Sequence, residues 1–233
     1  MTRATPIVPV VRYLLLDRVT YVLLPWTWAV FTFLIDVVIL ELTPAGDTAH
    51  RWVGGLGAVF AVMFAVGVQS AARALPLALS LGISRRGYYL GATALAGGLA
   101  VCFGLVVAVG QSVERATGGW GIDMAYFRVP YFLDGPWYQS WLTAAVAFAL
   151  LFVHGMWFGL IHRRAGLLGT TVFGAAQLCV LALAAVVATW AHDWHRIGRF
   201  LATLTAAGLT AALATALVVL VTGSYATIRR LTV

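Results

Sequence analysis

The chain has 233 residues, of which 62% are hydrophobic and only 10% are charged, and its mean hydropathy is +0.94. This composition excludes a water-soluble enzyme, because soluble domains carry far more charge and less apolar surface. All 15 basic residues are arginine, and with eight acidic residues they give a formal net charge of +7. Since a phosphate-binding loop of the G-x-x-x-x-G-K-[ST] type needs a lysine, the chain is not expected to hydrolyse ATP itself.

Long uncharged stretches predict six membrane-spanning helices, because one span needs roughly 20 apolar residues. In chain order the predicted spans cover residues 19–42, 53–72, 88–112, 139–161, 167–190 and 197–222. The predicted fold is therefore a single all-α domain, residues 1–233, that crosses a membrane six times. Ahead of the first span, residues 1–18 mix apolar side chains with Arg12, Asp17 and Arg18. This N-terminal segment fits either a helix lying on the inner membrane surface or an early start of the first span.

The arginines indicate the orientation of these spans. If the N-terminus is cytoplasmic, ten arginines lie on inner segments and five on outer ones. The inner ones are Arg3, Arg12, Arg18, Arg73, Arg85, Arg86, Arg163, Arg164, Arg229 and Arg230, and the outer ones are Arg51, Arg115, Arg128, Arg196 and Arg199. The acidic residues divide the other way, with Asp17 inside and Asp36, Glu41, Asp47, Glu114, Asp123, Asp134 and Asp193 outside. Because arginine is enriched on the cytoplasmic side, both termini are predicted to be cytoplasmic.

The second inner loop, residues 73–87, is too apolar for a free loop and too short to span a bilayer. Its apolar side chains are Leu75, Leu77, Leu79, Leu81 and Ile83. Pro76 suits the first turn of a helix, Gly82 suits its end, and Ser84 can cap the following span. The pattern predicts a short helix across the inner face, which either lies among lipid headgroups or docks into a groove on a cytoplasmic protein.

The run LPLALSLGISRRGYYLG, residues 75–91, resembles the permease subunits of the type-2 class of ABC transporters found in actinobacteria. The outer stretches ERATGGWG (114–121) and DGPW (134–137) and the terminal YATIRR (225–230) fit the same class. The resemblance implies a multi-pass subunit of a bacterial plasma membrane, with export as its direction. It further implies that the chain pairs with a second copy or a related permease chain, and that two separate ATPase subunits bind Mg-ATP. The chain itself would hold no cofactor, catalyse no reaction and bind no nucleic acid.

In that class the loop between spans 2 and 3 contains a coupling helix that seats in a cleft of the ATPase. On this chain the implied coupling residues are Arg73, Leu75, Pro76, Leu77, Leu79, Leu81, Ile83, Arg85 and Arg86. The arginines would pair with acidic groups of the ATPase or anchor the loop to anionic lipid. Spans 1 and 5 of the class face the dimer axis and the substrate path, which makes Trp26, Trp28 and Gln177 candidate pathway residues.

Few polar residues fall inside the predicted spans. Gln177 lies near the middle of span 5 and must find an interhelical partner or line a wet path. His154 is interpreted as a packing histidine, because Gly155 and Gly159 follow it as a small-xxx-small pair that permits close helix approach. The remaining polar residues, Gln69, Gln111 and Asp36, are expected to reach water from the span ends.

The outer segment, residues 113–138, is rich in glycine, proline and aromatic residues, and it is interpreted either as a lid over the bundle or as a packed connector. The outer pair His192 and His195 has i, i+3 spacing, but no third zinc ligand follows, so a surface cap on span 6 is favoured and no metal site is predicted. The outer segment 191–196 is too short for the re-entrant helices that many exporters of the resembled class carry there. Two other functions stay open, a polytopic membrane enzyme and a regulatory or assembly subunit that transports nothing.

Overall fold

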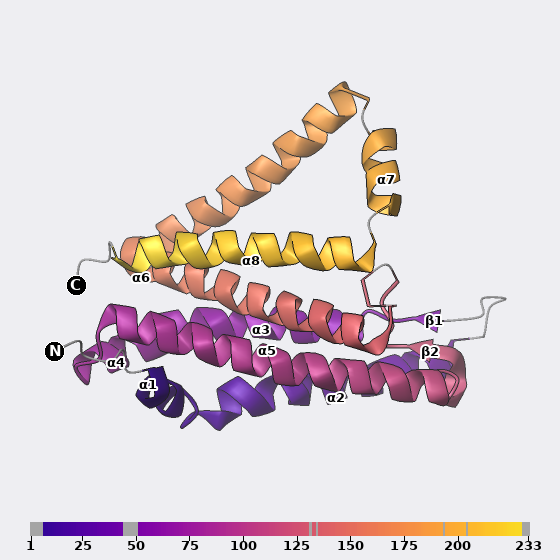
Figure 1. Ribbon diagram of the computed structural model, residues 1–233, viewed down its shortest axis with the longest axis horizontal. Coiled ribbons are helices and arrows are strands. Elements are labelled where there is room, and N and C mark those ends of the chain that lie inside the picture. The colour runs from indigo at the N-terminus through magenta and orange to yellow at the C-terminus, as the bar shows by residue number, and fades with distance from the viewer. Residues whose placement is uncertain are drawn as a thin grey trace.

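The computed structural model describes residues 7–43, 51–130, 132–133, 135–192, 194–203 and 205–229. Predictions that concern Arg3, Asp47, Asp134, Asp193 and Arg230 lie outside the described residues. The described elements are helices apart from one ladder of two short parallel strands, so the all-α prediction is confirmed (Figure 1).

Most of the long helices lie close to the positions that hydropathy predicts. In chain order the elements are α1 (Ile7–Leu14), η1 (Val19–Leu23), α2 (Leu24–Leu42), β1 (Arg51–Trp52), α3 (Gly55–Gln69), η2 (Ser70–Ala74), α4 (Leu75–Ser80), α5 (Arg85–Ala116), η3 (Gly119–Asp123), β2 (Met124–Ala125), α6 (Trp137–Trp190), α7 (Trp194–Thr203) and α8 (Ala206–Arg229). Five helices are long and apolar enough to cross a membrane, namely Val19–Leu42, Gly55–Ser80, Arg85–Ala116, Trp137–Trp190 and Ala206–Arg229.

The N-terminal helix α1 is separate from α2 and packs against α5. Its buried residues are Val10 and Leu14, and Val10 fits against Gly91, where an added Cβ would lie 2.5 Å from Val10 Cβ. The chain then turns, and Asp17 Oδ1 accepts a hydrogen bond from Thr20 N at 3.1 Å near the start of the π-helical turn η1. This capped turn separates α1 from the first long helix.

The short helix α4 is a direct continuation of α3. Pro76 lies in its first turn, Gly82 follows it with a φ of 81°, and Ser84 Oγ accepts from Gly87 N at 3.1 Å to cap α5. The difference from the sequence-based expectation is that η2 joins α3 to α4 without a break, so that Gly55–Ser80 forms one helical unit. Because proline has no N–H to donate, the wider π turn before Pro76 lets the helix continue past it.

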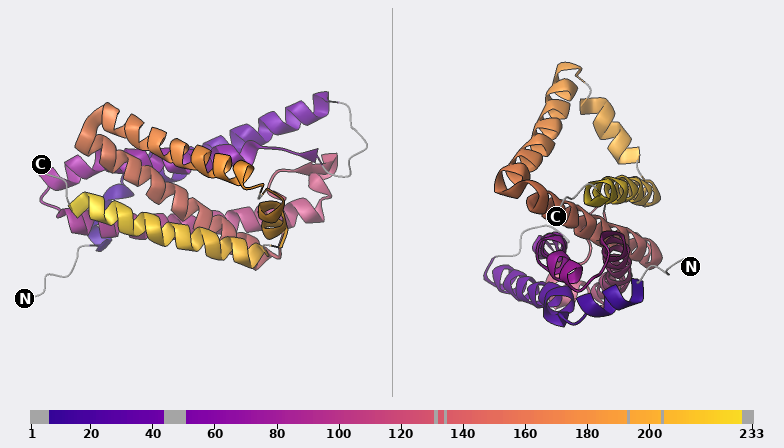
Figure 2. Two further views of the ribbon diagram at one scale, coloured as in Figure 1. Left: turned by 90° about the horizontal axis from the view of Figure 1, so that it is seen from above. Right: turned by 90° about the vertical axis from the view of Figure 1, so that its left-hand side faces the viewer.

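Gly166 divides α6 into two legs. Its φ of 62° and ψ of −160° are not helical and are accessible essentially only to glycine. The first leg, residues 137–165, runs beside α8, and the second leg, residues 167–190, folds back and diverges from the rest of the bundle (Figures 1 and 2). The predicted break between residues 161 and 167 is therefore a sharp turn at a single glycine.

The packed half of the molecule consists of α3, α5 and the first leg of α6. Where α3 crosses the first leg of α6, two glycines bring the backbones together: an added Cβ would lie 2.1 Å from Phe152 O at Gly67 and 2.0 Å from Phe64 O at Gly155. The close approach predicted from Gly155 and Gly159 is confirmed, and it occurs against α3. About one turn before these contacts along each helix, Phe148 stacks on Phe60 in the core, where Phe148 is 1% exposed.

The last predicted span, residues 197–222, is placed too early in the chain. Residues 194–203 form the separate helix α7, and α8 begins only at Ala206. The physical reason is that Arg196 and Arg199 make the first of these segments amphipathic, and Thr205 Oγ1 then caps α8 by accepting from Gly208 N at 3.1 Å. Hydropathy averaged over a long window hides such a short polar break.

Candidate functional site

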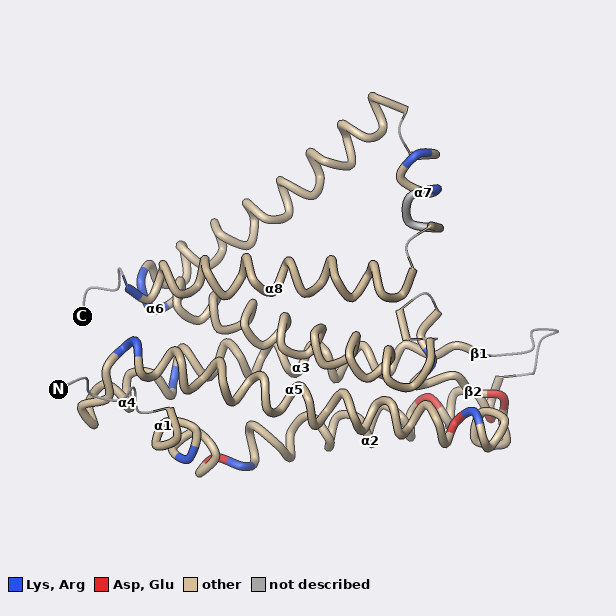
Figure 3. The backbone as a smooth tube through the Cα atoms, in the orientation of Figure 1, with Lys and Arg blue, Asp and Glu red and all other residues tan. Residues whose placement is uncertain are grey.

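Positive charge gathers at one end of the molecule. The described arginines at the end that holds α1, α4, the Gly166 turn and the end of α8 are Arg12, Arg18, Arg73, Arg85, Arg86, Arg163, Arg164 and Arg229, with one acid, Asp17, among them (Figure 3). The described acids of the opposite end are Asp36, Glu41, Glu114 and Asp123. The uneven distribution of charge that the sequence predicts therefore also separates the charges in space. We call the end that holds α1, α4, the Gly166 turn and the end of α8 the basic end.

At the basic end, α4 has one buried edge and one exposed edge. Leu75 and Ala78 are buried, whereas Leu77 is 55% and Leu81 is 64% exposed. The remaining predicted coupling residues lie on the same short stretch: Pro76, Leu79, Ile83 and Arg85 are half-buried, and Arg73 and Arg86 are exposed. The buried edge fixes α4 on the bundle, and the exposed edge offers leucine side chains flanked by guanidinium groups.

A hollow with a cavity volume of about 300 Å³ lies between α1 and the η2–α4 segment. The Tyr13 hydroxyl spans the two elements and donates a hydrogen bond to Ala74 O at 3.2 Å. Partial burial raises the pKa of Tyr13, and a tyrosine hydroxyl is a donor at neutral pH even without this shift. The hollow is lined by Tyr13, Leu14, Leu16, Asp17, Thr20, Tyr21, Gln69, Arg73, Ala74 and Leu77.

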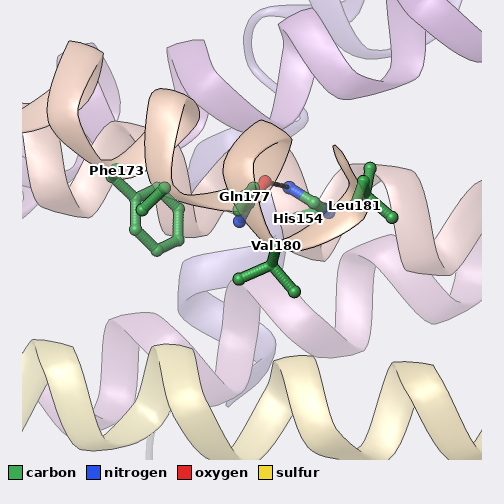
Figure 4. A pocket seen from close by; sticks show the side chains of 6 residues that line it. His154, Phe173, Gln177, Val180 and Leu181 are labelled. Atoms are coloured by element: carbon green, nitrogen blue, oxygen red, sulfur yellow. Dashed lines mark hydrogen bonds between the residues drawn. The ribbon is translucent and has the colours of Figure 1, made fainter. Parts of the chain in front are cut away.

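A second hollow lies between the two legs of α6, where His154 of the first leg meets Gln177 of the second (Figure 4). The His154 Nε2 and Gln177 Oε1 atoms are 3.2 Å apart, and the imidazole stacks on Phe158 with ring centroids 5.2 Å apart. The cavity volume is about 440 Å³, and the remaining lining residues are Phe173, Ala176, Val180 and Leu181. Gln177 therefore has an interhelical partner, and that partner is the histidine interpreted as a packing residue.

The two tryptophans predicted to line a pathway do not join this hollow. Trp26 is half-buried and packs edge-on against Phe103, with ring centroids 5.0 Å apart. Trp28 is 42% exposed and contacts Phe31 on the outer surface of α2. The structure thus separates Gln177 from Trp26 and Trp28, and the latter two point to different faces of α2.

A buried polar cluster at the acidic end was missed by sequence reasoning. Glu114 Oε2 accepts hydrogen bonds from Tyr126 N at 2.9 Å, from Phe127 N at 2.8 Å and from Trp120 Nε1 at 3.3 Å. Gln111, one turn earlier on α5, is buried and donates from Nε2 to Leu133 O, so the expectation that it reaches water is wrong. Among the described residues, the second oxygen of Glu114 and the amide oxygen of Gln111 have no hydrogen-bond partner. In the sequence, the one signal of this cluster is the i, i+3 spacing of Gln111 and Glu114, which places both side chains on the same face of α5.

This cluster packs the described part of the outer segment onto the helices. The Tyr126 hydroxyl donates to Ala29 O at 3.0 Å and lies 2.8 Å from Thr32 Oγ1, which ties the segment to α2. Burial raises the pKa of Tyr126. Asp36, expected only to reach water, accepts from Gly55 N at 3.1 Å and so caps α3. The described part of segment 113–138 is therefore packed against α2 and α5 in this conformation.

The remaining candidates for chemistry are dispersed. His192 and His195 are exposed beside the turn into α7, and Cys102 and Cys179 are exposed free thiols on different helices. Within the described ranges, no three His, Cys, Asp or Glu side chains come together as metal ligands. Comparison of the chain with protein-family models, with curated proteins and with solved structures finds no match.

Proposed function

We propose that the chain is the permease subunit of an ATP-driven transporter of the ABC type-2 class, and that it exports its substrate across a bacterial plasma membrane. The two legs of α6 would each cross the bilayer, which gives six crossings with the other four long helices. The basic end would face the cytoplasm, as the arginine distribution favours. The resemblance of residues 75–91 to that class supports the proposal together with the geometry of α4.

The observation that carries the proposal is the continuity of α4 with α3. Because η2 joins them without a break, a displacement of α4 by a soluble partner moves the whole Gly55–Ser80 helix. That helix touches α6 through backbone contacts at Gly67 and Gly155, where no flexible side chain can absorb the motion. A push on the exposed edge of α4 would therefore be passed into the bundle and could change which side is open.

The soluble partner that displaces α4 would be a pair of ATPase subunits, since they alone would bind and hydrolyse Mg-ATP. Closure of the two ATPase subunits around ATP would move the clefts that hold the α4 segments of two permease chains. The exposed Leu77 and Leu81 would enter such a cleft, and Arg73, Arg85 and Arg86 would face its acidic rim or the lipid surface. The second permease copy, or a related chain, would cover apolar surface of α2 and of the second leg of α6.

The test is recovery of the ATPase with the tagged full-length chain from native membranes. We expect Arg85→Glu combined with Arg86→Glu to lower the amount of ATPase recovered, because two repulsive charges replace two cations beside α4. Arg163→Glu combined with Arg164→Glu makes the same charge change at the basic end but away from α4, and it should leave recovery near the wild-type level. Equal recovery from both double variants would count against docking on α4. An intact native assembly that contains no ATPase would instead favour a regulatory or assembly subunit.

A further inference from the structure

The hollow between α1 and the η2–α4 segment contains one cation and one anion that do not pair with each other. Arg73 is exposed, and within the part of the chain that the structure describes it makes no hydrogen bond or ion pair. Asp17 lines the same hollow, and its Oδ1 is occupied by Thr20 N at 3.1 Å while it forms no ion pair with any described residue. A ligand that carries both charges would satisfy both side chains with charge-assisted hydrogen bonds.

Neutral polar groups line the same space. Gln69 is half-buried in the wall, and its amide makes no hydrogen bond among the described residues. The Tyr13 hydroxyl crosses the wall toward Ala74 O. Because a half-buried amide loses hydration without gaining a protein partner, a ligand with acceptor oxygens would be stabilised beside Gln69.

The rim of the hollow is apolar. Leu16 is 81% and Leu77 is 55% exposed, and both line the opening. The lining residues of the hollow lie at the basic end. There α1 and the start of the first long helix meet the end of Gly55–Ser80 (Figures 1 and 3). For a helix bundle in a bilayer, the ends of the apolar spans lie at the level of the lipid headgroups.

We propose that this hollow binds the headgroup of a zwitterionic phospholipid with a primary ammonium, of the ethanolamine type. The phosphate binds Arg73 and Gln69, the ammonium donates to the Asp17 carboxylate, and the acyl chains leave over Leu16. Because the lining contains one charge of each sign, a net-neutral headgroup matches it better than an anionic one. A primary ammonium is favoured over a quaternary one because it can donate hydrogen bonds to the carboxylate. The proposal requires a membrane but does not depend on any transport function.

The experiment is native mass spectrometry of the full-length chain in detergent, titrated with phosphatidylethanolamine, phosphatidylcholine and phosphatidylglycerol of identical acyl chains. We expect one phosphatidylethanolamine to be retained about tenfold more tightly than either other lipid. One well-formed charge-assisted contact accounts for an affinity difference of this size. Arg73→Gln should weaken phosphatidylethanolamine binding about tenfold. Asp17→Asn keeps an acceptor oxygen for Thr20 N, so it should remove the preference over phosphatidylcholine without unfolding the turn.

Arg12→Gln is the matched control, because Arg12 is an exposed arginine of α1 that does not line the hollow. It should leave the lipid preference unchanged, and circular dichroism should show the same helix content for all variants. Tighter binding of phosphatidylglycerol than of phosphatidylethanolamine would overturn the proposal, and so would equal losses in Arg73→Gln and Arg12→Gln. Displacement of the lipid by an equal concentration of soluble glycerophosphoethanolamine would overturn the assignment to a membrane lipid.

Discussion

The packed half and the second leg of α6 are equally apolar but differ completely in burial. The most apolar windows of α5 and α6 have hydropathies of 2.3 and 2.2. In the packed half Phe148 is 1% exposed and Phe152 is fully buried, whereas Leu178 and Leu181 of the second leg are 69% and 67% exposed. Hydropathy thus predicts which segments enter a membrane, but not which of them pack together. In lipid no hydrophobic force draws two helices together, so packing depends on small residues and on hydrogen bonds.

The small residues are concentrated where the helices touch. Gly67 and Gly155 let α3 and the first leg of α6 meet at the level of the backbone, and Gly104 does the same between α5 and α6. The second leg beyond Gly174 contains no glycine, and among its described residues only Ala188 is buried. The contrast teaches that glycine at the helix contacts marks which half of this chain is closely packed.

The largest expected effect is that of Gly155→Leu. A Cβ at this position would lie 2.0 Å from Phe64 O and 2.8 Å from Phe64 C, so α3 and α6 must separate. We expect a loss of stability at or above the upper end of the ~1–3 kcal/mol typical of overpacking, because backbone atoms cannot move aside. The measurement is the fraction of folded protein after heating in detergent, followed by size-exclusion chromatography.

Gly98→Leu is the matched control for this substitution. Gly98 lies within α5, and nothing lies within 4 Å of an added Cβ there. The same chemical change should therefore leave the folded fraction unchanged or raise it slightly, since leucine is the better helix former. Similar losses in both variants would mean that the α3–α6 crossing does not hold the packed half together.

A smaller effect is expected when the buried acid of the outer segment is removed. Glu114→Ala leaves the buried N–H group of Tyr126 and the half-buried N–H group of Phe127 without their acceptor. A buried donor without a partner costs about 1–3 kcal/mol, so we expect a loss of about 2–3 kcal/mol and faster hydrogen exchange at these two amides. Glu114→Gln keeps one acceptor oxygen, so its stability should lie between that of the wild type and that of the alanine variant.

The exposed Glu41 of the same end provides the control for this acid. Glu41→Ala removes an equal charge without breaking a buried hydrogen bond, and it should change stability by less than about 0.5 kcal/mol. Exchange at Tyr126 and Phe127 should be unaffected. If Glu114→Ala left this exchange unchanged as well, the outer segment would be held by its aromatic contacts alone.

The sequence predicts the individual helices and turns well, but it predicts poorly which of them contact each other. The long helices follow from apolar runs, and the turn after α4 follows from Pro76, Gly82 and Ser84, because each of these signals is local. The continuity of α3 with α4 could not be predicted, since it depends on a π turn whose hydrogen bonds leave no trace in composition. The boundary between α7 and α8 was not predicted, because hydropathy averaged over a long stretch joins a short amphipathic helix to a long apolar one.

Candidate sites are harder still to predict, because they are made of residues from distant positions. His154 and Gln177 were noticed separately, and only the fold at Gly166 brings them to 3.2 Å from each other. The burial of Gln111 depends on where Leu133 lies, and no spacing along α5 contains that information. The clustering of arginines at the basic end was predictable, because charge at the ends of spans is fixed by the membrane.

The smallest expected effect concerns the polar link between the two halves. His154 belongs to the packed half and Gln177 to the second leg, so their hydrogen bond joins a buried region to an exposed one. His154→Leu, Gln177→Leu and the double variant form a thermodynamic cycle. Hydrogen bonds between helices in a membrane are worth about 0.6 kcal/mol on average and about 1.7 kcal/mol at most, so we expect a coupling energy within that range.

A matched cycle lies nearby across the same turn. His162 Nδ1 and Thr170 Oγ1 are 3.3 Å apart and also join the two legs at the basic end. His162 is exposed and Thr170 is half-buried, and the hydrogen bond between them is exposed. Because water can replace that hydrogen bond, His162→Leu and Thr170→Val should show a coupling energy below that of the His154–Gln177 pair. Unfolding in detergent, with all seven proteins (the shared wild type, four single variants and two double variants) under one condition, measures both cycles. If the two coupling energies are equal, the His154–Gln177 bond is already open to water, and the second leg moves independently of the packed half.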